Sequence, residues 1–334
     1  MSSAANAVAR WIAPFLTIAA VAYLGLLAYA VNVGPGRAVR LAADEANPLA
    51  GTAFYVNPTS AAMRAAQQAD PPSPELIAIA NTPQAYWLVP GSSAATVAKY
   101  VGDAQAAGAM PVLALYGIPH RDCGSFAAGG FGSGAEYKGW IDGIAADIGQ
   151  APVAVIVEPD ALAMADCLSG DARQERYDLI RYAVDTLTRN PAAAVYIDAG
   201  HLRWHSAGDM AVRLNQAGVA QARGFSLNTA NFFTTEDEIG YGEAISGLTN
   251  GAHYVIDTSR NGVGPAPDSP LDWCNPRGRA LGIPPTTATA GAHADAYLWI
   301  KRPGESDGSC NRGDPPAGNF VTQFAVDLAR NAGH

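Results

Sequence analysis

Short apolar runs alternate with amphipathic segments along most of this chain. Several runs are apolar at successive positions, which is the pattern of strands covered on both faces of a sheet. The segments between them have helical spacing, and the one near residue 93 has Ser92 and Ser93 as candidate N-caps and Gly108 just past its end. The expected strands are 52–56, 85–89, 110–116, 153–158, 194–198, 224–228, 253–257 and 296–300, and the expected helices are 93–107, 137–149, 173–189, 206–217, 235–249 and 318–331.

This repeated alternation of strand and helix predicts a parallel sheet with helices outside it. About eight strands close most simply into a (β/α) barrel, and a doubly wound open sheet is the alternative. No glycine-rich phosphate-binding loop follows the first expected strand, which counts against a dinucleotide-binding fold. We therefore expect an α/β protein whose functional site lies at the carboxyl ends of the strands.

The N-terminus differs from the rest of the chain. Arg10 precedes a stretch without charge, residues 11–33, whose length suits a membrane span. The same stretch suits a long signal peptide, because residues 28–30 (AYA) have the small-x-small pattern of a cleavage site. Both interpretations stay open, and either places the rest of the chain outside the cytoplasm, secreted or anchored to the outer face of the cytoplasmic membrane. The expected organisation is a signal peptide or anchor (1–33), a linker (34–46) and one domain (47–334).

Composition and charge narrow the range of partners. The chain has 334 residues, 49% of them hydrophobic, which is enough for a large core. Its formal net charge is −9, and its 21 Lys and Arg residues are scattered without a basic run. This pattern counts against nucleic acid as a partner and favours neutral or cationic ligands.

Four cysteines in a chain expected to be exported indicate two disulfides. Three pairings are possible, and the sequential one, Cys123 with Cys167 and Cys274 with Cys310, closes the shorter loops and is the one we favour. A zinc site is the alternative, but the sequence has no CxxC pair and no suitable histidine spacing to support it.

Charged side chains recur where the expected strands end. A single acid at a strand–helix junction often caps the helix, but Asp122 and Asp307 lie in glycine-rich loops beside cysteines. Because the carboxyl ends of parallel strands meet at one edge of the sheet, we expect these side chains to converge. The residues at strand exits are Arg121, Asp122, Glu158, Asp160, Asp198, His201, Asn228, Asp257, Lys301, Glu305 and Asp307.

Aromatic residues occur near the same strand ends. Trp204 and Trp273 lie in polar loop sequences, where a role in the core is less natural than a role at a site. Flat aromatic faces next to carboxylates and amides are a common way to bind sugars. Two carboxylates in different protonation states can also hydrolyse a glycosidic bond, one as an acid and one as a base.

Seven motifs in order give the chain a resemblance to a known family. Together they cover roughly residues 47–331 and resemble glycoside hydrolase family 6, the inverting cellulases with a distorted parallel (β/α) barrel. The resemblance implies about seven to eight strands, hydrolysis of β-1,4-glucan and no metal or organic cofactor. The motifs are YGIPHRDCGS (116–125), VIVEPD (155–160), YIDAGH (196–201), LNTANF (227–232), VIDTSRNGVGP (255–265), DWCNPRGRALG (272–282) and LWIKRPGESDG (298–308).

The same resemblance implies roles for single residues. Asp160 would be the general acid, Asp122 would raise the pKa of that acid and help to order the attacking water, and Asp307 would be the base. Asp198 would bind sugar and support this group of acids, and Tyr116 would lie under the distorted sugar. The resemblance also implies both sequential disulfides. The remaining sugar-binding positions are Trp87, His201, Trp204, Asn228, Trp273, Lys301 and Glu305.

The chain also departs from the family pattern. Gly117 stands where relatives often carry Asp or Asn, and Ala127 and Ala128 stand where a serine that orders water is expected, with Ser125 close by. Tunnel-forming relatives need long loops over the cleft, whereas here the connection from Trp273 to Asp307 has little extra sequence and the loop after Cys123 is short, which predicts an open cleft and endo-acting cleavage. We expect a monomeric endoglucanase, with a noncatalytic β-glucan-binding protein as the alternative. A membrane-tethered structural protein would explain the N-terminus only.

Overall fold

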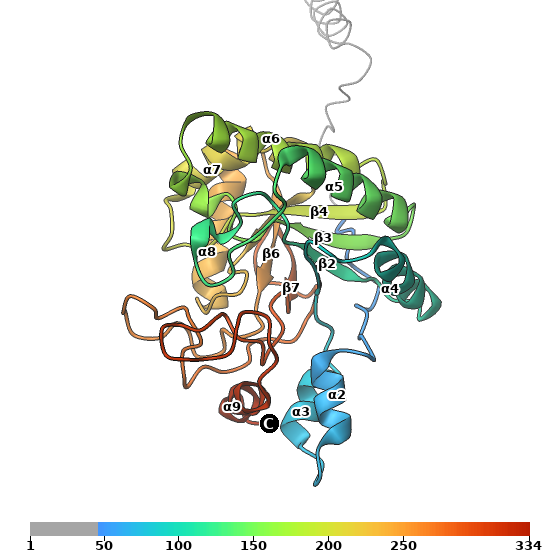
Figure 1. The fold of residues 1–334 in the computed structure, drawn as a ribbon, viewed down its shortest axis with the longest axis vertical. Helices are drawn as coiled ribbons and strands as arrows, with labels where there is room; N and C mark the ends of the chain where they lie inside the picture. Colours follow the sequence, from blue (N-terminus) through green and yellow to red (C-terminus); the bar gives the residue numbers. More distant parts are fainter. Residues whose placement is uncertain (1–45) are drawn as a thin grey trace, which may run out of the picture. The chain divides into compact units, whose positions relative to one another are not determined.

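The computed structural model describes residues 46–334 (Figure 1). The expected signal peptide or anchor (1–33) and nearly all of the expected linker (34–46) lie outside the described residues. Among residues 46–334, no helix is long and apolar enough to cross a membrane.

Seven parallel strands form one sheet, and their spatial order is their order in the chain. Leu113 of the second strand pairs with Val155 of the third, which pairs with Val195 of the fourth, so neighbouring strands align their apolar positions. The strands are β1 (Tyr86–Leu88), β2 (Val112–Leu115), β3 (Val153–Val157), β4 (Ala193–Asp198), β5 (Gly224–Leu227), β6 (His253–Asp257) and β7 (Ala294–Leu298).

The sheet curls into a distorted half-barrel, which confirms the expected fold class. Its two edges are joined beside β1 and β7 by two hydrogen bonds instead of a ladder. The Ala85 amide donates to the Trp299 carbonyl at 2.9 Å, and Trp87 Nε1 donates to the Ile300 carbonyl at 2.8 Å. Both acceptors follow β7, whereas Ala85 directly precedes β1 and Trp87 lies within it.

The prediction of a first strand at residues 52–56 is wrong. This segment makes only an isolated bridge between Phe54 and Met110, with two backbone hydrogen bonds to Met110. Gly51 adopts a left-handed φ of 79° just before the segment, and Pro58 lies just after it. The segment between them pairs with its neighbour at one position only, so no ladder forms. The sheet therefore has seven strands.

Helices connect the strands at nearly the expected positions. Ser93 is the N-cap of α4 and accepts a hydrogen bond from the Thr96 amide, as its sequence position predicts. The short helices α2 and α3 were not expected. The helices are α2 (Ala61–Gln68), α3 (Pro74–Ala80), α4 (Ala94–Ala106), α5 (Gly134–Ile148), α6 (Gly170–Leu187), α7 (Ala207–Gln216), α8 (Thr235–Leu248) and α9 (Thr322–Asn331).

Alternate residues of each strand face two different apolar layers. Leu113 and Leu115 belong to the outer layer between the sheet and the helices, whereas Val112 and Ala114 belong to the layer on the inner side of the curl. A third cluster joins α2, α3 and α9 around Trp299, which is 3% exposed. Trp299 is therefore a core residue.

Long loops follow β6 and β7, and Figure 1 shows them in orange and red-brown. The disulfide Cys274–Cys310 joins these two loops, and the disulfide Cys123–Cys167 joins the loops after β2 and β3. Both pairings agree with the expected ones. Each disulfide thus ties together loops that leave the carboxyl ends of the sheet.

Candidate active site

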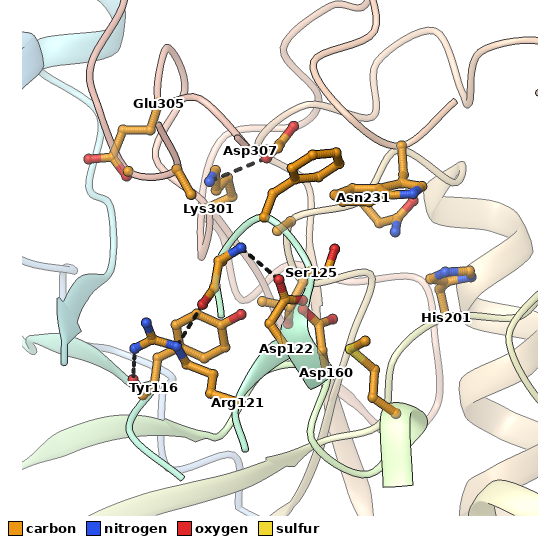
Figure 2. Close-up of a pocket in the computed structure, with 18 of the residues that line it drawn as sticks. Tyr116, Arg121, Asp122, Ser125, Asp160, His201, Asn231, Lys301, Glu305 and Asp307 are labelled. Carbon is orange, nitrogen blue, oxygen red and sulfur yellow. Dashed lines mark hydrogen bonds and ion pairs between the residues drawn. The ribbon is translucent and has the colours of Figure 1, made fainter. Parts of the chain in front are cut away.

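A cavity of about 700 Å³ opens at the carboxyl ends of the strands (Figure 2). All of the predicted site residues except Asp198 and Asn228 line it. They come from β1, from the exits of β2, β3, β4 and β7, and from the loop between β6 and β7. The sequence rule that parallel strands carry the site at their carboxyl ends therefore places most of the candidates correctly.

Asp122 lies on a tight turn at the exit of β2. Asp122 and Cys123 have left-handed φ values of 58° and 47°, a conformation that non-glycine residues rarely adopt. The Ala127 amide donates to Asp122 Oδ2 at 2.7 Å, so the backbone orients this carboxyl group. Burial raises the pKa of Asp122 above its usual value.

Arg121 organises the same loop through carbonyl oxygens. Its guanidinium donates to the Tyr116 carbonyl at 2.8 Å and to the Ala127 carbonyl at 2.9 Å. It also lies 4.6 Å from the centre of the Tyr116 ring (Figure 2). Arg121 therefore links the end of β2 to the segment that contains Ala127 and Ala128.

Asp160 lies at the exit of β3, again with a left-handed φ, of 69°. Its amide donates to Asp198 Oδ1 at 2.9 Å, and its carboxyl group faces the cavity beside Asp122 (Figure 2). Burial raises the pKa of Asp160 well above its usual range, and the charges of Asp198 and Asp122 raise it further. These surroundings therefore favour the protonated form of the Asp160 side chain.

Glu158 is buried and has a structural role that the sequence did not predict. Its carboxyl group accepts hydrogen bonds from the Gly117 and Ile118 amides at 3.0–3.1 Å, which ties the exit of β2 to the exit of β3. Burial raises the pKa of Glu158 to about 7. Gly117 has no room for a side chain, because a Cβ atom there would lie 2.8 Å from the Trp140 ring.

Asp198 and Asn228 do not line the cavity, which corrects their expected contact with sugar. Both are fully buried. Asp198 accepts hydrogen bonds from the Asp160 and Gly200 amides, and burial raises its pKa to about 6. The Asn228 amide group donates to the Phe233 and Asp257 carbonyls. Both side chains instead form hydrogen bonds with backbone groups at the strand exits. Those of Asp198 lie beside Asp160, and those of Asn228 lie within the loop after β5 and at the end of β6.

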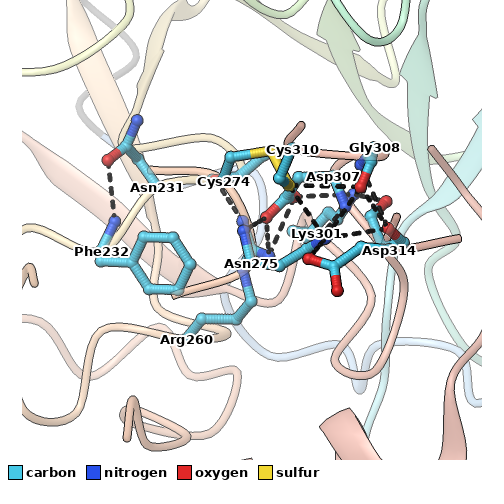
Figure 3. A network of polar contacts seen from close by, with 12 residues as sticks. Asn231, Phe232, Arg260, Cys274, Asn275, Lys301, Asp307, Gly308, Cys310 and Asp314 are labelled. Carbon is cyan, nitrogen blue, oxygen red and sulfur yellow. Dashed lines mark hydrogen bonds and ion pairs between the residues drawn. A yellow bond between two sulfur atoms is a disulfide. The ribbon is translucent and has the colours of Figure 1, made fainter. Parts of the chain in front are cut away.

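Asp307 is held by positive charge and by backbone (Figure 3). Arg260 Nη1 lies 3.0 and 2.9 Å from its two carboxylate oxygens, and Lys301 Nζ lies 3.3 Å from Oδ1. The Asn275 amide donates to Oδ2 at 3.0 Å, and the Asp307 amide donates back to Asn275 Oδ1 at 2.7 Å. Burial alone would raise the pKa of Asp307, but Arg260 and Lys301 outweigh it and the net shift is downward.

The cavity therefore combines carboxyl groups with opposite preferences. Asp160 favours its protonated form, and Asp307 favours its ionised form. Such a difference between neighbouring acids is the usual basis for assigning an acid and a base or a fixed charge.

Aromatic rings line the walls. His201 stacks on Phe233 at 4.4 Å and lies 5.1 Å from Trp204. Burial, with a smaller contribution from Arg203, lowers the pKa of His201 to about 3, so its ring is neutral near pH 7. At other parts of the wall Trp87 lies edge-on to Tyr116 and Phe126 lies near Trp273.

Within residues 46–334, no group of three or more His, Cys, Asp or Glu side chains is arranged to bind a metal ion.

The family profile of the Glycosyl hydrolases family 6 matches residues 49–332. The chain belongs to this family. The match covers the whole sheet, both disulfides and every residue of the cavity described above.

Relatives of this family 6 chain include endoglucanases. It is 48% identical over 290 residues to endoglucanase A of Cellulomonas fimi, covering 85% of this chain, and it spans only 62% of that relative's length. It is 40% identical over 288 residues to endoglucanase 1 of Streptomyces halstedii, covering 82% of this chain and 88% of the relative.

A solved structure is more similar still. The endoglucanase Cel6 from Mycobacterium tuberculosis, in complex with methyl-cellobiosyl-4-deoxy-4-thio-β-D-cellobioside, is 72% identical to the chain with a TM-score of 0.86. The match covers 86% of this chain and all of that one.

Several functional contacts in this family 6 site were not expected from the sequence. Arg260 and Asn275 hold Asp307 although they lie 47 and 32 residues before it. Phe126 and Phe233 contribute rings to the walls, and Arg203 lines the cavity rim. Arg260 and Asn275 lie within family motifs, and Phe126 and Phe233 directly follow two others, but the sequence does not say which side chains face one another.

Proposed function

We propose that this protein is an endo-acting glycoside hydrolase that cleaves internal β-1,4-glucosidic bonds in cellulose or a related β-glucan and inverts the anomeric configuration. The observation that carries this proposal is the set of carboxyl groups with opposite charge preference around one cavity walled by aromatic rings. The endoglucanases among its relatives support the same activity.

Asp160 is the proposed general acid. It gives its proton to the glycosidic oxygen as the bond to the anomeric carbon breaks. A general acid must be protonated near the working pH, and the raised pKa of Asp160 meets this requirement. Its fixed position beside Asp198 supports a defined direction of proton transfer.

Asp122 is the proposed acceptor of the proton from water, which differs from the role that the resemblance gives to Asp307. Arg260, Lys301 and the Asn275 amide surround both oxygens of Asp307 and make it a weak proton acceptor. We assign Asp307 instead a fixed negative charge that stabilises the positive charge of the oxocarbenium-like transition state. Asp122, whose pKa is raised, takes up a proton more readily.

Water in this scheme attacks the face of the anomeric carbon opposite the leaving oxygen. Inverting enzymes keep their acid and base carboxyl groups roughly 6.5–9.5 Å apart to make room for that water. The Ala127 and Ala128 side chains carry no hydroxyl group, so Asp122 and the backbone of its loop are left to orient the water. Ser125 on the same loop also lines the cavity.

The cavity walls supply the proposed sugar-binding surface. Rings of Trp87, Tyr116, Trp204 and Trp273 offer flat apolar faces, and Lys301, Glu305 and His201 offer hydrogen-bonding groups. The ligand in the Mycobacterium tuberculosis Cel6 complex is a thio-linked cello-oligosaccharide, which supports β-1,4-glucan as the substrate class. No metal or organic cofactor takes part in the proposed chemistry.

We also propose that the protein acts outside the cytoplasm as a monomer. Two disulfides are consistent with an oxidising compartment. Residues 1–33 would direct export and either be removed or anchor the catalytic domain, which we assign to residues 47–334.

The direct test compares Asp160→Asn with the unchanged protein on carboxymethylcellulose. Loss of the acid proton should lower release of reducing ends and loss of viscosity by at least ~100-fold, since general acids contribute about 10²–10⁴-fold. Asp185→Asn, which changes an exposed aspartate on α6, is the matched control and should retain full activity. An Asp160→Asn variant with full activity and an unchanged melting temperature would contradict the assignment, and an inactive unchanged protein would contradict the proposed function.

A further inference from the structure

Two histidines lie side by side at the amino end of the sheet, the end opposite the cavity. His253 is the first residue of β6, and His293 directly precedes β7. These strands are neighbours, and the Tyr254 amide donates a hydrogen bond to the His293 carbonyl at 2.9 Å. The centres of the two imidazole rings are 5.6 Å apart, and the ring planes are at 70° to each other. Neither histidine lines the cavity.

A carboxyl group holds each ring through its Nδ1 atom. His253 Nδ1 lies 3.1 Å from Asp295 Oδ1, and His293 Nδ1 lies 2.7 Å from Glu243 Oε2. The carboxyl groups are fixed in turn. Asp295 is 1% exposed, and Glu243 Oε1 accepts hydrogen bonds from the Tyr254 hydroxyl at 2.8 Å and the His293 amide at 3.0 Å. The orientation of both rings is therefore set by buried or bonded neighbours.

The charge of these carboxyl groups decides which nitrogen of each ring carries hydrogen. Burial would raise the pKa of Asp295, but hydrogen bonds from Arg223 and His253 outweigh it, and the net shift is downward. Burial acts in the same way on Glu243, and hydrogen bonds from the His293 amide and ring lower its pKa overall. Both groups are thus ionised near neutral pH, and an ionised carboxylate only accepts hydrogen bonds. Nδ1 of each ring therefore carries the hydrogen atom, and Nε2 of the neutral ring has the lone pair.

The two Nε2 atoms are suited to bind one ion. Both rings make their hydrogen bonds through Nδ1, and the side chains of His253 and His293 are 22% and 37% exposed, so an ion can reach them from solvent. Zn²⁺ binds an imidazole nitrogen at about 2.0–2.1 Å, which places the ring centre ~3 Å from the ion. Two rings with centres 5.6 Å apart can therefore share one ion. A carboxylate bonded to the other ring nitrogen is the usual support of a metal-binding histidine.

We propose that His253 and His293 bind a divalent transition-metal ion such as Zn²⁺ through their Nε2 atoms, with water in the remaining positions. Imidazole is a preferred ligand of Zn²⁺ and its neighbours in the transition series. The ion would link the amino ends of β6 and β7, which the long connection through residues 258–293 leaves joined only by the ladder of the sheet. The site is structural and lies away from the cavity, so this inference goes beyond the proposed glucanase function and does not depend on it.

The test titrates the full chain, without an affinity tag, with ZnCl₂ by isothermal titration calorimetry in a buffer that does not bind metal. His253→Gln and His293→Gln each remove one ligand, and His334→Gln changes an exposed histidine at the C-terminus as the matched control. The unchanged chain and the control should bind one Zn²⁺ with the same affinity, and the ion should raise their melting temperature. Either ligand variant should bind Zn²⁺ at least ~10-fold more weakly and lose the rise in melting temperature.

Glu243→Gln tests the supporting carboxylate while both histidines stay in place. The glutamine amide can donate to His293 Nδ1, which moves the ring hydrogen to Nε2 and removes the lone pair that binds the ion. The affinity for Zn²⁺ should fall about 10- to 100-fold. Melting temperatures without the ion show which variants are folded, and any one folded site variant decides the test. Full affinity in a site variant would show that Zn²⁺ is an adventitious ion only and would overturn the site, as would absence of Zn²⁺ binding to the unchanged chain.

Discussion

At the scale of single residues, two aspartates that line the same cavity favour different protonation states. Asp160 lies in a buried position beside Asp198 and Asp122, and these surroundings raise its pKa. Asp307 is also buried, but the positive charges of Arg260 and Lys301 outweigh the effect of burial and lower its pKa. The identity of the neighbours, more than burial itself, decides which carboxyl group can act as an acid.

Asp198→Asn tests this electrostatic argument through the pH dependence of kcat/KM. Activity requires protonated Asp160, so it falls as pH rises through the Asp160 pKa. Removal of the Asp198 charge lowers the Asp160 pKa, and the alkaline limb should move to lower pH. Asparagine can still accept hydrogen bonds from the Asp160 and Gly200 amides, so the fold is preserved. An alkaline limb that stays in place, as in the Asp185→Asn control, would show that Asp198 does not tune the acid.

At the scale of structural elements, the long loops after β6 and β7 depend on buried polar contacts instead of regular secondary structure. The side chains of Arg260 and Asp307 are 4% and 5% exposed and are paired, and Arg260 also lies 4.3 Å from the centre of the Phe232 ring. These contacts join the exits of β5, β6 and β7 (Figure 3). The disulfide Cys274–Cys310 reinforces the same joint.

Arg260→Met should therefore destabilise the protein by about 3 kcal/mol, because it leaves Asp307 buried with Lys301 as its remaining cation. The free energy of unfolding in urea measures the effect. Lys99→Met removes an exposed pair on α4 and should cost less than ~1 kcal/mol. A loss for Arg260→Met no larger than that of the control would show that the buried pair does not stabilise these loops.

At the scale of the whole molecule, the curl of the sheet brings Asp122, Asp160 and Asp307 into one cavity from strand exits far apart in the chain. The sequence could predict this convergence, because parallel strands carry their carboxyl ends to one edge and apolar runs mark the strands. The prediction of a strand at 52–56 was wrong because an apolar run in the sequence does not show whether a neighbouring strand pairs with it along its length.

Other features of the site could not be predicted from the sequence. Asn228 and Asp198 lie at strand ends as Asp160 does, but local hydrogen bonds hold their side chains away from the cavity. The partners of Asp307 come from separate loops, and only the tertiary fold brings them together.

The stereochemistry of the first product tests the central claim most directly. Hydrolysis of cellotetraose is followed by ¹H NMR within the first minutes, before the new reducing end mutarotates. An acid and a water molecule acting on opposite faces of the sugar should release the α-anomer first. A first product with the β-anomeric configuration would contradict the account.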